Sequence, residues 1–131
     1  MSDERARLDE ISRLAGRATG LRLLALFGSR ARGDAAEGAD WDFGYLADER
    51  FDPEGFRAST TEILGTERVD LVDLSRASAL LRYRAARDGA PVYEATPKRF
   101  EDFQVEASLF WCDVEWVVRR AYDEILADLR R

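Results

Sequence analysis

The 131-residue chain contains no histidine, a single cysteine and a single lysine. Without histidine it cannot carry a Ser-His triad or histidine acid–base chemistry, and the usual zinc sites are excluded as well. Its lysine, Lys98, does not stand in a GxxxxGK[ST] pattern, which excludes a P-loop. Cys112 cannot form an intramolecular disulfide and suits a reducing cytoplasm. Because it falls in an apolar segment, we predict a buried, unreactive thiol.

The sequence also lacks long apolar runs and an excess of positive charge. No stretch approaches the roughly 20 apolar residues that cross a membrane, and the charged N-terminus does not resemble a signal peptide. We therefore expect a cytoplasmic protein that does not associate with membranes. The net charge of -6 disfavours generic binding to nucleic acid, because phosphate backbones attract basic surfaces.

The residues that carry chemistry begin after an apolar segment, residues 21–27, which predicts a buried strand. Gly28 and Ser29 follow, and then Arg30 and Arg32. Glycine lets the backbone approach a ligand, and free N–H groups at a turn attract phosphate oxygens. Ser29 adds a hydroxyl and is expected to cap the next turn, and arginine is well suited to gripping phosphate. This segment predicts a phosphate-binding turn.

Three aspartates predict a metal site beside that turn. Asp40 and Asp42 stand at the start of a second predicted strand, and because side chains alternate in a strand, they share one face. Such a pair suits Mg²⁺, and two ions about 3.5–4 Å apart can clamp a phosphoryl displacement. Asp70, in a third predicted strand, is the preferred third ligand, since a charge among apolar neighbours is costly unless it is paired. Asp73 is the competing ligand, although alternation puts it on the opposite face.

This combination resembles the minimal nucleotidyltransferase (MNT) family of the DNA polymerase beta-like superfamily. The resemblance rests on Gly28-Ser29, ten intervening residues, the pair Asp40-x-Asp42 and a later strand that carries Asp70. It implies a palm-like fold in which an acceptor hydroxyl attacks the α-phosphate of a nucleoside triphosphate, with ATP as the expected donor. It also implies two Mg²⁺ ions held by Asp40 and Asp42, with Asp70 completing one of the two metal sites.

The remaining patterns predict an α/β fold, a small mixed sheet flanked by helices, in a single domain over residues 1–131. Its core spans about residues 1–95, and a helical extension follows over about 96–131. The three site strands are expected at 21–27, 41–46 and 68–74, an edge strand at 91–94, and helices at 1–20 (capped by Ser2), at 53–64 (capped by Asp52) and from Ser75 or Ser78 to Arg87. The arginines at 82, 84 and 87 are interpreted as a solvated face.

The last helix is expected to run from Thr96-Pro97 to about Leu129, with a wide apolar face. It would be about 45 Å long, which exceeds the about 30 Å expected for so small a domain. Its end should therefore overhang and contact another chain, unless a kink folds it onto the core. The candidate anchors are Phe110, Trp111, Trp116, Val118 and Tyr122.

The resemblance also bears on the partner. Stand-alone MNT proteins typically pair with a small helical HEPN toxin, an RNase, and act as antitoxins by transferring AMP to a toxin tyrosine. Because the chain has no histidine, it cannot itself carry the HEPN Arg…His motif. Two alternatives stay open: a nucleotidyltransferase for a small molecule such as an antibiotic, and a non-catalytic antitoxin that acts by binding.

Overall fold

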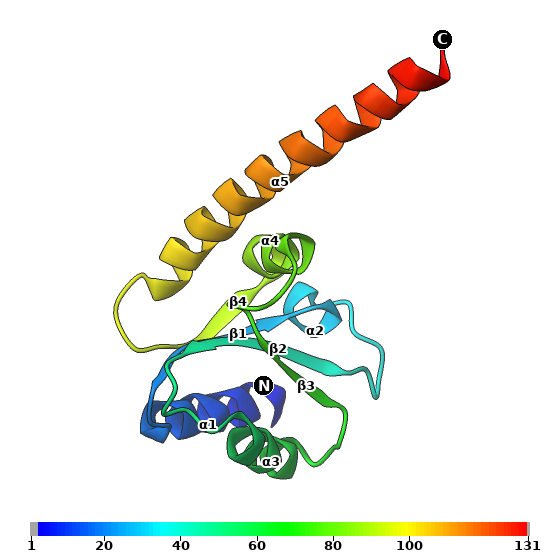
Figure 1. Ribbon diagram of the computed structural model, residues 1–131. Coiled ribbons are helices and arrows are strands. Elements are labelled where there is room, and N and C mark those ends of the chain that lie inside the picture. The colour runs from blue at the N-terminus through cyan, green and yellow to red at the C-terminus, as the bar shows by residue number, and fades with distance from the viewer. Residues whose placement is uncertain (1–2, 131) are drawn as a thin grey trace.

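The computed structural model describes residues 3–130, so the predicted cap Ser2 lies outside the described residues (Figure 1). In chain order the elements are α1 (Asp3–Arg17), β1 (Leu21–Phe27), α2 (Ser29–Arg32), β2 (Trp41–Ala47), α3 (Pro53–Leu64), β3 (Val69–Asp73), α4 (Ala79–Asp88), β4 (Ala90–Glu94) and α5 (Arg99–Leu129). The sheet has the order β3-β2-β1-β4, in which β2 and β3 are parallel and the other neighbours antiparallel. The predicted mixed α/β fold is confirmed.

Helices cover both faces of the sheet (Figure 1). On one face α1 and α3 pack on a cluster that includes Ile11, Phe43 and Phe56. On the other face α4 and the first turns of α5 pack on a smaller cluster that includes Phe27 and Phe103. Within residues 3–130, no helix combines the length and apolarity needed to cross a bilayer.

Capping residues set the helix boundaries. The Asp52 carboxylate accepts a hydrogen bond from the Gly55 N–H at the start of α3, as its position before a proline predicts. At the start of α4 the cap is Ser78, whose hydroxyl accepts from the Leu81 N–H. The other candidate, Ser75, instead donates to Asp73.

Helix α5 is unbroken over its 31 residues and projects beyond the sheet (Figure 1). It begins at Arg99, slightly later than predicted, because Lys98 adopts a left-handed conformation (φ 65°) that does not continue into a helix. The predicted overhang is confirmed and the alternative kink is excluded. Cys112 is exposed on this helix, so the prediction of a buried thiol is wrong. Helical spacing identified the apolar residues around Cys112. It did not show where along α5 the packing on the core ends.

Candidate active site

The turn between β1 and α2 brings backbone and carboxylate together. Gly28 has φ 76°, a conformation that side chains rarely adopt, and a Cβ atom at this position would overlap Asp42 Oδ2. Glycine is therefore required here both for the bend and for the close approach. Gly28 is also the N-cap of α2, and Ser29 is the first residue of that helix. No side-chain hydrogen bond caps α2, contrary to the expectation that Ser29 caps the turn.

The strand register places Asp42 and Asp70 opposite one another. The two residues are paired Cα to Cα in the parallel β2–β3 ladder. Their neighbours Trp41 and Val69 point into the cluster beneath α1 and α3, so alternation turns both carboxylates to the α4 side of the sheet. Asp40 immediately precedes β2 and belongs to the same group, since its charge acts on Asp42.

The carboxylates at this site act on one another electrostatically. The pKa of Asp42 is raised above its ordinary value of 3.8, first by burial and then by the negative charges of Asp70 and Asp40. Arg32 opposes the shift. Burial and like charges of this kind disfavour the ionised carboxylate, and a bound cation would favour it.

An all-oxygen carboxylate group fits Mg²⁺ by donor type. Across residues 3–130, however, no three acidic or cysteine side chains already surround one position suitable for a metal ion. Mg²⁺ usually takes only one or two protein carboxylates and completes its shell with substrate phosphates and water. The carboxylates present therefore fit Mg²⁺ by donor type and by number.

Asp73 is held away from this group. Its Oδ1 accepts hydrogen bonds from the Ser75 N–H at 3.0 Å and from the Ser75 hydroxyl at 2.6 Å. It lies opposite Tyr45 in the ladder, three residues beyond Asp70, and so on the other face. The structure thus brings Asp70, and not Asp73, to Asp42.

Arg30 and Arg32, the two arginines that were predicted to bind phosphate, have different surroundings in the structure. The Arg30 guanidinium donates from Nε (3.1 Å) and Nη2 (2.9 Å) to the Ala39 carbonyl. It also stacks over Trp41 at 4.0 Å from the ring centroid and pairs with Glu4. Arg30 therefore fixes the loop that precedes Asp40, a role that sequence spacing did not predict. Arg32, in contrast, lies near enough to Asp42 for its charge to act on that carboxylate, and it forms an ion pair with the exposed Asp34.

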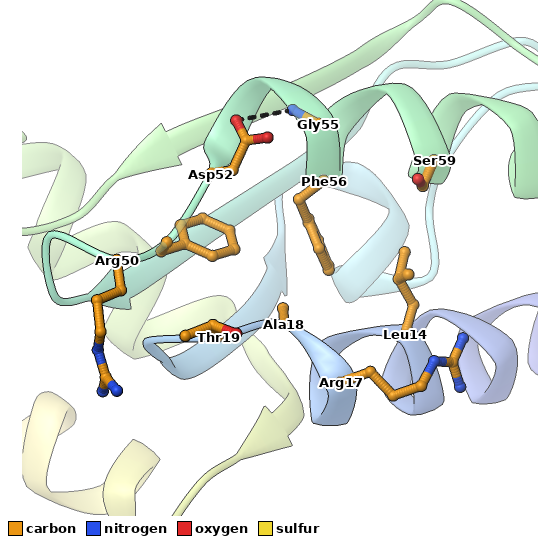
Figure 2. Close-up of a pocket in the computed structure, with 10 residues that line it drawn as sticks. Leu14, Arg17, Ala18, Thr19, Arg50, Asp52, Gly55, Phe56 and Ser59 are labelled. Carbon is orange, nitrogen blue, oxygen red and sulfur yellow. Dashed lines mark hydrogen bonds between the residues drawn. The ribbon is translucent and has the colours of Figure 1, made fainter.

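A separate hollow of about 300 Å³ lies at the ends of α1 and α3 (Figure 2). Arg17 and Arg50 border it, and Asp52, which caps α3, lies at its rim. None of the site aspartates lines it. It lies on the opposite face of the sheet from Asp42 and takes no part in the candidate site.

The chain belongs to the polymerase beta nucleotidyltransferase family, whose model matches residues 9–98. It is 31% identical over 140 aligned residues to the protein adenylyltransferase MntA of Aphanizomenon flos-aquae, and the match covers 96% of this chain and 93% of that protein. The predicted resemblance is thereby confirmed.

Two solved structures have a similar fold. One is a toxin–antitoxin structure with AMP-PNP, with a TM-score of 0.73 and 22% identity over 96% of this chain and 99% of that one. The other is the complex of a tri-AMPylated HEPN toxin from Shewanella oneidensis with its MNT antitoxin, with a TM-score of 0.71 and 23% identity over 93% of this chain and 98% of that one.

Proposed function

We propose that this chain is a Mg²⁺-dependent nucleotidyltransferase that acts as an antitoxin by transferring AMP from ATP to a tyrosine hydroxyl of a HEPN RNase toxin. The observation that carries the proposal is the pairing of Asp42 with Asp70 beside the Gly28 turn. It occurs in a chain similar over 96% of its length to a protein adenylyltransferase. Relatives of the same fold have been solved with AMP-PNP and with an AMPylated HEPN toxin.

In this proposal Asp40, Asp42 and Asp70 are the protein ligands of two Mg²⁺ ions. The ions, when bound, neutralise phosphate charge and make the acceptor hydroxyl more acidic. The turn at Gly28 and Ser29 offers N–H groups to the phosphates, as turn backbone does in other anion sites. Arg32 adds a full positive charge on the same side of the sheet.

The transfer forms one bond and breaks one. The tyrosine oxygen bonds to the α-phosphorus, and the bond between that phosphorus and the bridging oxygen of pyrophosphate breaks. Asp70 is exposed and takes up the hydroxyl proton. The chain's contribution is mainly orientation and charge stabilisation, which dominate phosphoryl transfer.

The overhanging part of α5 is the proposed docking surface for the toxin. Phe103 and Ala107 pack on the core, and helical spacing continues their stripe into Val118, Tyr122 and Ile125. These three are 57–61% exposed, beyond the end of the sheet. An apolar face of this kind marks a protein interface more often than a free surface.

Intact mass spectrometry of the partner toxin, incubated with this chain, ATP and Mg²⁺, tests the proposal. We expect the toxin to gain mass in AMP-sized steps and pyrophosphate to be released. Asp42→Asn and Asp70→Asn should abolish the gain, whereas Asp73→Asn, a change of the same kind on the other face of β3, should retain it. A toxin that is neutralised without any gain in mass would favour the contact-only antitoxin.

A further inference from the structure

A cavity of about 370 Å³ lies between α4 and the Gly28 turn. Its lining includes Gly28, Arg32, Arg84 and Arg87, with Asp88 as the acidic residue among them. The lining therefore carries two net positive charges, in a chain whose overall charge is -6. This local reversal of sign makes the cavity attractive to an anion.

The cavity opens on the side of the sheet that holds the site carboxylates. Helix α4 lies on that side, with α1 and α3 on the other (Figure 1). Phe27, which lines the cavity, is the direct partner of Asp42 across β1 and β2. Adjacent strands are about 4.8 Å apart, so the cavity begins roughly one strand away from Asp42.

One carboxylate already stands where the three arginines converge. Asp88 accepts from Arg87 Nε at 3.0 Å and Nη2 at 2.9 Å. The positive charges of Arg32 and Arg84 also help lower the pKa of Asp88. An anion with more charge and more oxygens than a carboxylate can use all three guanidinium groups.

We propose that Arg84 and Arg87, together with Arg32, bind the β- and γ-phosphates of the donor nucleotide and retain them as the pyrophosphate leaving group. This inference rests on the proposed function and extends it to α4, outside the sequence motif. Asp88 competes with the phosphates for Arg87, so it weakens binding and eases release. Arg84 and Arg87 are exposed, as the predicted solvated face requires, but sequence spacing did not show that the fold places both beside Gly28. Arg82 instead lies over the Phe110 ring on α5.

Calorimetric titration with ATP, pyrophosphate and AMP, in the presence of Mg²⁺ and without partner, tests this assignment. We expect Arg84→Ala and Arg87→Ala each to weaken binding of ATP and pyrophosphate roughly tenfold, the usual effect of losing a charge-assisted hydrogen bond. AMP binding should be unchanged, because AMP has no β- or γ-phosphate. Asp88→Asn should act in the opposite direction and strengthen ATP and pyrophosphate binding.

Arg13→Ala is the matched control, since Arg13 is an exposed helical arginine on α1, on the other face of the sheet. It should leave all three affinities unchanged. Arg84→Lys, which keeps the charge, should recover part of the ATP affinity, and circular dichroism checks that each variant is folded. A merely structural role for α4 would not separate ATP from AMP or give Asp88→Asn the opposite sign.

The outcomes separate the two proposals. If the wild type transfers AMP but the α4 variants bind ATP normally, this inference is overturned and the proposed function stands. If pyrophosphate binding follows the predicted pattern but no AMP is transferred, the cavity assignment stands and the proposed function falls. A wild-type chain that binds neither ATP nor pyrophosphate overturns both.

Discussion

At the scale of single residues, Asp42 is the point at which most constraints on the site meet. It faces Asp70 across the parallel ladder, lies against the Gly28 backbone and is followed by core residues of β2. A carboxylate in this setting is repelled by its neighbours until cations arrive, so the binding site is held at a cost to stability.

Asp42→Asn should therefore stabilise the chain at neutral pH in EDTA. Because burial and negative neighbours raise the pKa of Asp42 in the folded state, the folded chain binds this proton more tightly than the unfolded chain. Wild-type stability then falls as pH rises from the unfolded value near 3.8 through the raised folded pKa, and the penalty persists at neutral pH. Thermal unfolding of the wild type and of Asp42→Asn, measured as a function of pH, gives this loss of stability.

The gain from Asp42→Asn should disappear below the unfolded pKa, where both states of the wild type are protonated. Mg²⁺ should stabilise the wild type more than the variant. Asp73→Asn is the contrast, because that carboxylate accepts two hydrogen bonds from Ser75 and its loss should not stabilise. A lower melting temperature for Asp42→Asn in EDTA at neutral pH would contradict this account.

Gly28→Ala should reduce AMP transfer by roughly tenfold or more, since strain and displacement of Asp42 together exceed the 1.36 kcal/mol that changes a rate tenfold. Gly33→Ala is a close control, because Gly33 has φ 82° but nothing within 4 Å of an added Cβ. Gly33→Ala therefore introduces backbone strain without a contact to Asp42, so AMP transfer should change little. Equal losses of activity in the two variants would show that backbone strain, and not the contact with Asp42, governs the site.

At the scale of elements, α5 consists of two parts with different energetic roles. Phe103 is 1% exposed and packs on the sheet, whereas Ile125 is 57% exposed on the overhang. Phe103→Ala should lower the free energy of unfolding by about 3–5 kcal/mol through lost burial and a cavity. Ile125→Ala should change it by no more than about 0.5 kcal/mol. Urea titrations measure both, and comparable losses would mean that the overhang folds back on the core in solution.

Most helices and strands could be predicted from the sequence because their positions depend on nearby residues. Apolar runs gave the strands, and the cap at Asp52 gave the start of α3. Asp70 was favoured as the third aspartate because a charge among apolar neighbours is costly unless it is paired, and because alternation along the strand put Asp73 on the opposite face. What could not be predicted depends on contacts between distant segments. Arg30 turns to the Ala39 carbonyl, and Arg84 and Arg87 meet the Gly28 turn, only because the fold brings those backbones together.

At the scale of the whole molecule, the site and the proposed docking surface are carried by different parts of the chain. The carboxylates lie on β2, on β3 and just before β2, while the exposed apolar residues lie on the projecting end of α5 (Figure 1). A protein acceptor held by α5 needs no pocket of its own, because docking makes its hydroxyl a local reactant. Orientation of this kind can contribute about 7–11 kcal/mol to a barrier.

Docking should therefore be separable from catalysis. The triple variant Val118→Asp/Tyr122→Asp/Ile125→Asp should lower AMP transfer to the folded toxin by roughly a hundredfold or more, because the lost contacts remove that orientation. Transfer to a short tyrosine peptide, which cannot dock, should be equally slow for the variant and the wild type. Ala127→Asp is the control, since it lies two residues from Ile125 and thus about 200° around the helix. If the triple variant modifies the toxin at the wild-type rate, or if light scattering shows no complex between wild type and toxin, α5 does not hold the acceptor.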